Sequence, residues 1–444
     1  MKKTLKKALC TIGVALMLTS VVPAAKAQET TQDISDWALE TLVEGEKYGI
    51  FPMEWYLQDF RSEISTNRLT LLIELTEAKI AALELPKNVE FTPVAVEGNT
   101  TRKDILNRLF NIIAQYDVNV GNDPLKYLQE RKILQGSEND LMLNQKATTE
   151  QAVIFAIRLI QDTYDQADGG SKGVAWIVED EDTKIYLLGS IHKGIPDLYP
   201  INQKLKKAFN QSDALFVEVN SLDPNGLQYY VDNAFYKEGE TIQQNISEET
   251  YAKLEKVSKQ LDIPLENLSS MKPWFLSSNL SSLMQDGAFG LEELSQYGID
   301  LHFILNAYLQ QKPIYELEGM KSQVDMMNDL SKKAQEEELV GLLDSILAND
   351  IDEEIALISD WFKYWKSGDI KNFANSIGTL ESEDEFSKML LGKRDEAMAN
   401  TIIDLLENEQ GIFFVVVGAG HFLVDKTIFY HLEKNGYNVT PFYE

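Results

Sequence analysis

The sequence predicts an α/β fold with a central, mostly parallel sheet and flanking helices, preceded by an all-helical region. From Val174 onward, short apolar segments alternate with longer segments of helical pattern, as in layered α/β folds. Two apolar segments end in a glycine turn and a histidine, Gly189-Ser190-Ile191-His192 and Gly418-Ala419-Gly420-His421. Loops from separated parallel strands converge beyond the carboxyl ends of those strands. We therefore expect the two histidines at one site.

The amino terminus has the pattern of an export signal. Four lysines within the first seven residues precede an apolar stretch at residues 8–22, and Ala25-Lys26-Ala27 resembles a cleavage site. We expect residues 1–27 to be removed. No later segment has the run of about 18 uncharged apolar residues that a membrane span needs, so the mature chain is expected to be secreted without one.

The charge and cysteine content of the chain indicate which kinds of partner and environment suit it. The chain has 41 Lys and Arg against 70 Asp and Glu, a net charge of −29, and loss of the five signal lysines would make it about −34. Nucleic acid is excluded as a partner, because phosphate binding needs a basic surface. Cys10, the only cysteine, lies in the signal. An exported chain without disulfides is typical of the outer face of a Gram-positive-type bacterium.

The expected elements follow in order after the glycine-rich turn at residues 168–173. Residues 173–444 are expected to form the α/β domain. Its predicted strands are residues 174–178, 184–188, 214–219, 313–317, 412–417 and 438–442. Its predicted helices are residues 200–210, 248–261, 299–310 and 427–435, with an almost wholly helical, acidic interval at residues 321–408.

Residues 28–167 carry a weak internal repeat of helix, glycine turn, polar loop and a second helix with a Ser or Thr N-cap. The second helices are expected to start near Ser65-Thr66, Thr101-Arg102 and Thr148-Thr149. This pattern resembles the S-layer homology module, whose family attaches exported proteins to cell-wall polymers. Thr101-Arg102-Lys103-Asp104 is the copy closest to the T-R-x-E-like signature of that family. The alternative is a generic helical domain.

The paired histidines point to metal chemistry. Imidazole is the commonest metal ligand and a general base near neutral pH. Glu218 lies at the end of the apolar strand predicted at residues 214–219, so its carboxylate is either at an exposed strand end or directed into a site. His192, His421 and Glu218 are therefore the candidate metal ligands. This mixed nitrogen and oxygen set suits manganese, cobalt or zinc without selecting one.

Four further side chains, Asp300, Glu318, Arg394 and His302, could take part in the chemistry, and Glu218 and His302 also have plainer interpretations. Asp300 or Glu318 could accept a proton from water or orient a ligand histidine. Arg394 could stabilise an oxyanion or bind a peptide carboxylate. The alternative for Glu218 is a purely structural role, in which it caps a helix or pairs with Arg394 or Lys272. His302 lies on an expected amphipathic helix, where packing is its plainer role.

The order of these motifs resembles the TraB/GumN family, which includes the Tiki proteins and bacterial pheromone-shutdown proteins, over residues 173–444. The further matching strings are Lys272-Pro273-Trp274, Tyr297-Gly298-Ile299-Asp300, Leu317-Glu318 and Arg394-Asp395. The resemblance implies an α/β fold related to erythromycin-esterase-like proteins and a metal-dependent hydrolytic site. The Tiki members of the family are peptidases that use manganese or cobalt. The resemblance carries site roles to His192, Glu218, Arg394 and His421, with Asp300, His302 and Glu318 as second choices. The catalytic candidates among these residues are Glu218, Arg394, Asp300 and Glu318. Asp395 stands where the family more often has asparagine.

The resulting hypothesis is a secreted or wall-associated, metal-dependent hydrolase that acts on peptide bonds, with residues 28–167 as the candidate segment for attachment to cell-wall polymer. One alternative is a non-catalytic protein that sequesters a signalling peptide. The other is a wall-anchored structural protein whose α/β domain is a degenerate enzyme. The sequence identifies neither the substrate, the metal nor the oligomeric state.

Overall fold

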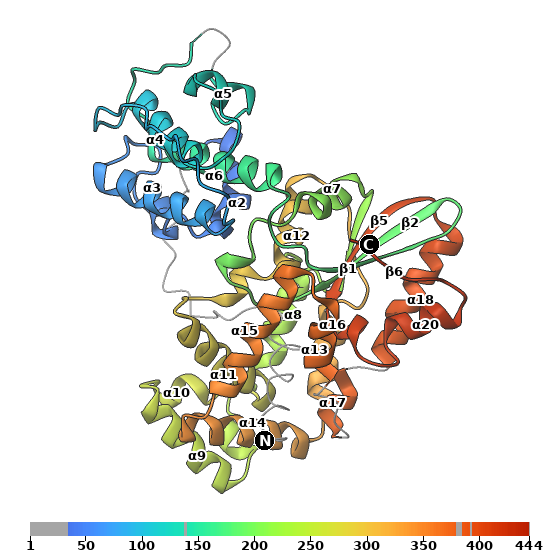
Figure 1. Ribbon diagram of the computed structural model, residues 1–444. Coiled ribbons are helices and arrows are strands. Elements are labelled where there is room, and N and C mark those ends of the chain that lie inside the picture. The colour runs from blue at the N-terminus through green and yellow to red at the C-terminus, as the bar shows by residue number, and fades with distance from the viewer. Residues whose placement is uncertain (1–33, 137–139, 379–383, 391–392, 444) are drawn as a thin grey trace. The chain divides into compact units, whose positions relative to one another are not determined.

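The computed structural model describes residues 34–136, 140–378, 384–390 and 393–443 (Figure 1). These residues form two compact units. The α/β unit consists of Lys172–Ile195 and the described residues from Lys207 onward, and the helical unit consists of the described residues up to Ser171 together with Pro196–Lys206. The predicted export signal, with Cys10, lies outside the described residues.

The α/β unit contains one six-stranded sheet in the order β4-β3-β5-β2-β1-β6. The strands are β1 (Val174–Glu179), β2 (Thr183–Ser190), β3 (Ala214–Val217), β4 (Ile314–Glu316), β5 (Gly411–Gly418) and β6 (Thr440–Pro441). The neighbours β4, β3, β5 and β2 are parallel, whereas β1 runs antiparallel to both β2 and β6. The predicted mostly parallel α/β fold is confirmed, and each predicted strand overlaps an observed one.

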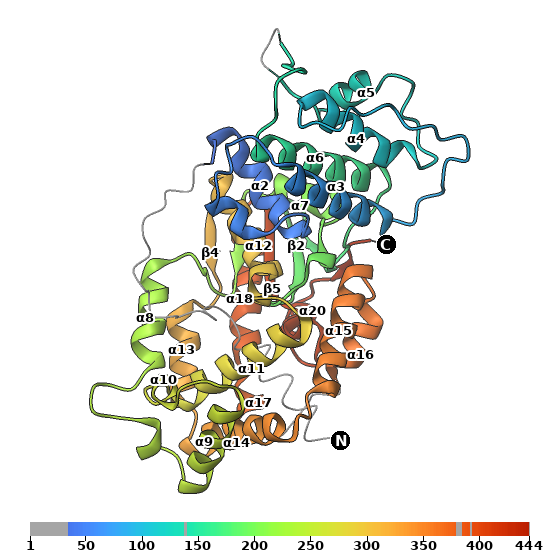
Figure 2. The same cartoon turned by 90° about the vertical axis from the view of Figure 1, so that its left-hand side faces the viewer.

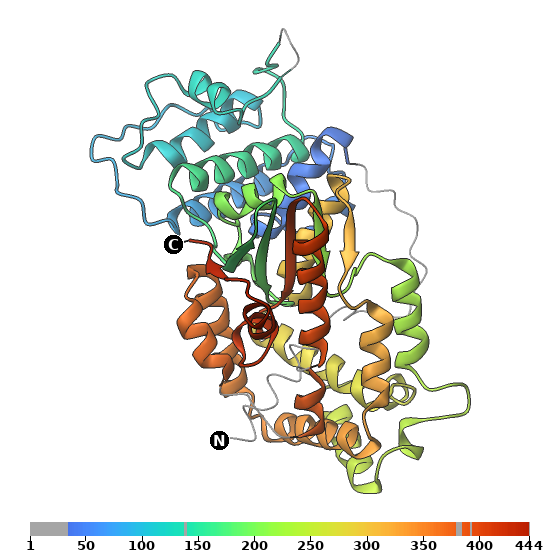
Figure 3. The same cartoon turned by 90° about the vertical axis from the view of Figure 1, so that its right-hand side faces the viewer.

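Helices cover both faces of this sheet. On one face, Phe414 of β5 packs against Phe303 of α12 (Ile299–Leu309) and Phe209 of α7 (Gln203–Gln211), with ring centroids 5.1 and 5.5 Å away. On the other face, Trp176 of β1 packs against Phe422 and Phe429 of α19 (Gly420–Leu423) and α20 (Ile428–Lys434). Figure 3 shows α18 (Lys393–Asn408) running beside the sheet near α20. Burial on both faces explains why these strands are continuous apolar runs.

A layer of helices lies beyond the carboxyl ends of the parallel strands. Val219, just after β3, belongs to a buried cluster with side chains of α8 (Pro224–Ala234), α11 (Pro273–Phe289), α13 (Met320–Asp329) and α17 (Glu385–Leu390). A second cluster joins α11 to α9 (Glu248–Gln260) and α14 (Lys332–Ala348). Figure 2 shows α8 and α13 side by side in this layer. The strands therefore end against packed side chains of helices.

The remaining elements of the α/β unit are short turns and surface helices. They are η5 (Ile242–Gln244), α10 (Leu265–Leu268), η6 (Leu294–Tyr297), α15 (Asp352–Ser367) and α16 (Ile370–Gly378). The predicted helical interval at residues 321–408 is occupied by α13 to α18, with the gaps that the description leaves. Among the residues that the structure describes, no helix is both long enough and apolar enough to cross a bilayer.

The helical unit is built on three helices that begin after Ser or Thr N-caps: α3 (Thr66–Ala81), α4 (Arg102–Ala114) and α6 (Thr149–Gln166). Backbone bridges Glu63↔Thr148 and Thr101↔Lys146 join the residues around their amino ends. The other elements are η1 (Asp36–Ala38), α2 (Leu39–Gly45), η2 (Glu46–Tyr48), η3 (Met53–Leu57), α5 (Pro124–Glu130) and η4 (Pro196–Leu198).

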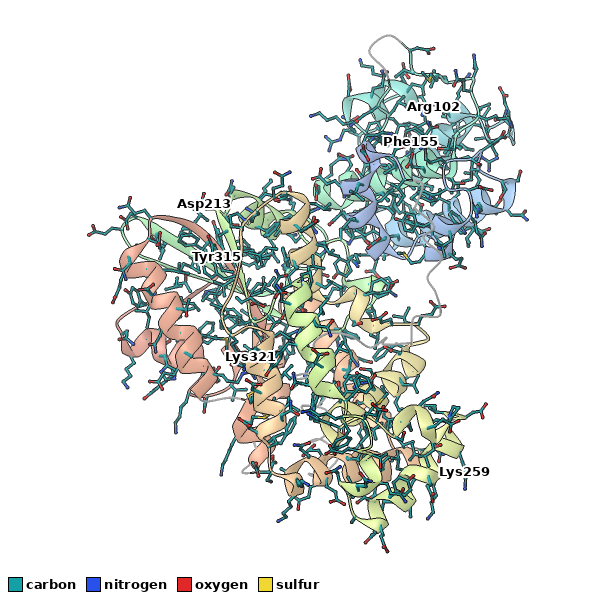
Figure 4. All side chains as sticks on the ribbon, turned by 180° about the vertical axis from the view of Figure 1, so that it is seen from behind. Arg102, Phe155, Asp213, Lys259, Tyr315 and Lys321 are labelled. Carbon is teal, nitrogen blue, oxygen red and sulfur yellow. The ribbon has the colours of Figure 1, made fainter. Side chains whose placement is uncertain are left out.

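Arg102, the arginine of the T-R motif, is buried in this unit. Its guanidinium donates to the carbonyls of Leu141 and Gln135 and lies 4.9 Å from the ring centroid of Phe155 (Figure 4). These contacts give the side chain a packing role within the unit. Attachment to wall polymer and membership of the S-layer homology family therefore stay predictions.

Candidate active site

The register of the sheet brings the two histidine turns together. Ser190 at the end of β2 lies opposite Gly418 at the end of β5, and Val217 of β3 pairs with Val416 of β5. The amide of Ala419 donates to the carbonyl of Ser190, which ties one turn to the other. Because these strands are parallel, the residues that follow them emerge at the same edge.

His192 lies beside a carboxylate from α12. The ring is 7% exposed, and its Nδ1 lies 3.2 Å from Oδ1 of Asp300, close enough for an ion pair but not aligned as a hydrogen bond. Burial alone would lower the pKa of His192, but the charges of Asp300 and Glu218 outweigh burial and raise it above the usual value. Asp300 is in the first turn of α12, and Gly298 lets that helix approach closely, because a Cβ at Gly298 would lie 2.4 Å from the carbonyl oxygen of His192.

His421 has a similar partner from another helix. Its ring is 7% exposed, and Nδ1 lies 2.9 Å from Oδ1 of Asp395, a fully buried residue on α18. A carboxylate that accepts from Nδ1 leaves Nε2 as the lone-pair nitrogen, which is the form of imidazole that binds metals or accepts protons. The Nε2 atom of His421 lies 3.8 Å from Oε2 of Glu218.

Glu218 follows β3 and is only 3% exposed. Its Oε1 accepts from the amide of Gly418, and its Oε2 accepts from Arg394 Nη2 at 3.3 Å and Gln323 Nε2 at 3.2 Å. Burial alone would raise the pKa of Glu218, but the nearby charges of His421, His192 and Arg394, with the Gly418 amide, lower it below the usual value. Glu218 is therefore an ionised carboxylate held in a fixed orientation.

Arg394 joins Glu218 to a second buried carboxylate. Its Nε and Nη2 donate to the two oxygens of Glu318, both at 2.7 Å, which is a bidentate pair. Gln323 of α13 also donates to Glu318, at 3.0 Å. The side chains of Arg394 and Glu318 are 10% and 7% exposed. Arg394 and Gln323 thus each bridge the two glutamates.

Gly418 lies at the centre of the proposed ligand set. A Cβ placed there would lie 3.2 Å from Glu218 Oε1, 3.4 Å from His192 Nε2 and 3.7 Å from Cδ2 of His421. The two histidines and the glutamate therefore surround a space that glycine leaves open. His192 has its Nε2 on this side, whereas His421 has its Cδ2 here and its Nε2 3.8 Å from Glu218 Oε2. Both histidines have a carboxylate beside Nδ1, which is the arrangement found behind metal-ligating histidines.

The donor chemistry of these residues fits a divalent cation. No group of three or more His, Cys, Asp and Glu side chains in the described part of the chain is already arranged to hold a metal ion. Both oxygens of Glu218 already accept hydrogen bonds, from Arg394, Gln323 and Gly418. The Nε2 of His192 lies beside the space at Gly418, the Nε2 of His421 lies beside Glu218, and a metal ligand from Glu218 would compete with Arg394.

All six residues proposed from the sequence lie within this one network: His192, Glu218, Asp300, Glu318, Arg394 and His421. Lys272 instead donates to Asn328, so the plainer pairing of Glu218 is with Arg394. The ring of His302 packs against Phe303 with centroids 5.2 Å apart, in keeping with a packing role.

Sequence reasoning missed two side chains of the network, Asp395 and Gln323. Asp395 was visible only as a departure from a family pattern, and its contact with His421 depends on the path of α18. Gln323 lies five residues after Glu318 along the turn into α13, and the sequence around it carries no motif.

The residues of this site lie within the part of the chain that is similar to known proteins. A model of the TraB/PrgY/gumN family matches residues 174–441. Uncharacterized protein YbaP of Escherichia coli strain K12 is 27% identical over 236 residues, which are 53% of this chain and 83% of that protein. Metalloproteases TIKI2 and TIKI1 of Xenopus tropicalis are 25% and 22% identical, and the match covers 57% and 60% of this chain and the same shares of those proteins. No solved structure matches the chain at a significant level.

Proposed function

The chain belongs to the TraB/PrgY/gumN family, and from this premise we propose that it is an exported, metal-dependent hydrolase that acts on peptide bonds. The observation that carries the proposal is the meeting of His192, His421 and Glu218 around Gly418. The similarity to two proteins named metalloproteases supports hydrolysis of peptides as the reaction.

We assign the metal to His192 and His421, with Glu218 as the third ligand. Manganese, cobalt and zinc all suit these donors. When bound, the metal would polarise a carbonyl and make a coordinated water more acidic. Asp300 and Asp395 orient the two imidazoles through their Nδ1 atoms.

Arg394 and Glu318 are assigned to the substrate side of the reaction. Arg394 could stabilise an oxyanion or bind one carboxylate oxygen through its Nη1 group. Its Nε and Nη2 are held by Glu318 and Glu218, and one Nη1 hydrogen goes to the carbonyl of Leu390. Glu318 is also a candidate to accept a proton from water, because its carboxylate is buried beside the network.

Histidine substitutions test the metal assignment. His192→Ala and His421→Ala should each abolish metal binding without unfolding the chain, and elemental analysis of the purified protein measures the loss. His431→Ala is the matched control, because His431 lies on α20, next to Tyr430, and has no place in the network. Unchanged metal content in both site variants would refute the assignment.

A peptide-library cleavage screen with manganese, cobalt and zinc then tests the reaction. A second candidate function, peptide sequestration without cleavage, is favoured by one observation: Glu218 is fully engaged by Arg394, Gln323 and Gly418. That candidate predicts tight peptide binding and no cleavage with any of the three metals.

The proposed function includes a location outside the cell. We propose that the mature chain is secreted and that the helical unit attaches it to wall polymer. Incubating the mature protein with purified cell wall tests this attachment, and Arg131→Ala serves as a surface control, because Arg131 pairs with Asp162 at the surface of the same unit. Recovery of all the protein in the supernatant would overturn it.

A further inference from the structure

Lys193, the residue after His192, is almost completely buried. It is 5% exposed, and its ammonium donates to Ser282 Oγ and Gln285 Oε1, both at 2.8 Å. Both acceptors are on α11 and are each 1% exposed. Lysine is rarely buried in this way, because removing an ammonium from water costs several kcal/mol. An apolar side chain would fill the same space at lower cost, so packing alone gives no reason for a lysine here.

The hydrogen bonds continue from Lys193 to another helix. Gln285 donates through Nε2 to Glu354 Oε1 at 2.7 Å and to Ser281 Oγ at 3.2 Å. Glu354 lies in the first turn of α15. We call these five residues, Lys193, Ser281, Ser282, Gln285 and Glu354, the Lys193 cluster. It links the turn after β2 to α11 and α15.

Besides the bond from Ala419 to Ser190, three other hydrogen bonds hold the backbone around the same turn. Trp365, near the other end of α15, donates through its indole to the carbonyl of Gly189 at 2.7 Å. The amide of Ile299 donates to the carbonyl of Ile191, and the amide of Gly194 donates to the carbonyl of Leu294, both at 3.0 Å. Lys193 adds the side-chain attachment of this turn to α11.

We propose that Lys193 is a positioning residue, which fixes the turn after β2 so that the ring of His192 keeps its place beside Asp300, Glu218 and His421. The inference rests on the proposed function only for its effect on catalysis. Its effect on the geometry of His192 stands independently.

Burial supports this reading of Lys193. Removal from water lowers the pKa of Lys193 to about 8, against the opposing charges of Asp286, Glu354 and Glu293. The bonds to Ser282 and Gln285 need only the amine hydrogens, so the attachment depends on the reach and direction of the side chain.

The test uses Lys193→Met, which replaces lysine with an unbranched side chain one atom shorter and removes its donors. The chain has four histidines, so labelling histidine at the ring Cε1 gives four NMR signals, which His-to-Gln variants assign. Lys193→Met should shift or broaden the signal of His192 and leave those of His302 and His431 in place. Lys79→Met is the matched control, because Lys79 is a buried lysine of the helical unit that donates to the carbonyl of Pro196.

A second variant guards against misfolding. Ser282→Ala removes one acceptor of Lys193 and should move the His192 signal in the same direction by a smaller amount. If both variants fold and leave the signal of His192 unchanged, Lys193 is a structural lysine and the proposal is wrong.

Measuring peptide cleavage distinguishes failure of the positioning role of Lys193 from failure of the proposed hydrolase function. If the wild-type chain cleaves peptides, Lys193→Met should lower kcat roughly tenfold or more, since small misplacements of catalytic groups are costly, while KM changes little. A loss confined to thermal stability, with kcat and the His192 signal intact, would overturn the proposal. If the wild-type chain cleaves nothing, the proposed function fails, and the NMR result alone decides the role of Lys193.

Discussion

Asp395 shows how much of the site depends on one buried side chain. Its carboxylate is fully buried and has the Nδ1 of His421 at 2.9 Å, so it sets which nitrogen of that imidazole carries the proton. Alanine would leave the Nδ1 hydrogen without an acceptor inside the protein. Asparagine would keep an acceptor oxygen in a side chain of nearly the same size.

We therefore predict different outcomes for the two substitutions. Asp395→Ala should weaken metal binding about 10–100-fold, as loss of such supporting carboxylates does elsewhere, and should destabilise the fold by about 1–3 kcal/mol. Asp395→Asn should stay within a few-fold of wild type. Calorimetric titration with manganese, cobalt and zinc and denaturant unfolding measure both effects. Equal losses in the two variants would show that charge, and not the acceptor oxygen, is what His421 requires.

At the scale of elements, a single carboxylate ties two helices of the α/β unit together. Glu336 of α14 accepts from the amide of Ser247, the N-cap of α9, at 2.8 Å and from the hydroxyl of Thr250 at 2.5 Å. Burial would raise the pKa of Glu336, but these hydrogen bonds outweigh burial and lower it below the usual value of 4.5.

The lowered pKa of Glu336 determines how its contribution to the free energy of unfolding changes with pH. Because the pKa of Glu336 is lower in the folded chain than in the unfolded chain, its contribution is complete above about pH 4.5 and is lost as the pH falls through the folded value. Glu336→Gln should cost roughly 1 kcal/mol or less at neutral pH, after solvent screening. The difference in unfolding free energy between wild type and variant should shrink on acidification, as measured by denaturant unfolding from pH 7 to pH 3.

The control for this prediction is the next residue. Glu337→Gln alters an exposed carboxylate that lies 3.6 Å from Lys333 on the same helix, and it should change stability by less than about 0.5 kcal/mol at either pH. A difference for Glu336→Gln that stays constant or grows as the pH falls would contradict the assigned pKa direction.

The elements also show what could be predicted from the sequence. Parallel strands buried on both faces produce continuous apolar runs, so the runs at β2 and β5 were recognisable, as was the glycine turn that ends each of them. The order of strands in the sheet was not, because hydropathy does not specify neighbours. Helix-borne contributors such as Gln323 and Asp395 were missed, since they reach the network only through helix packing.

At the scale of the whole molecule, the two units are interleaved along the chain. Residues 196–206 come after β2 in sequence, yet they belong to the helical unit. Asn202 donates to the carbonyl of Gly169, Gln203 donates to the carbonyl of Asp165, and Ser171 forms a backbone bridge with Ile201. A cut after Ser171 therefore removes the helices that these residues contact and leaves the segment behind.

We predict that the fragment 172–444 is less soluble than the full mature chain. Leu198, Tyr199, Ile201 and Leu205 are at most 1% exposed, and each such burial is worth about 1.5–3 kcal/mol. Without residues 34–171 these side chains would form an exposed apolar segment, so the fragment should bind a hydrophobic dye and aggregate. Replacing Leu198, Ile201 and Leu205 with serine should reduce dye binding by the fragment but destabilise the full chain. If the fragment is as soluble as the full chain and binds no more dye, the apolar side chains of residues 196–206 are buried against the α/β unit instead.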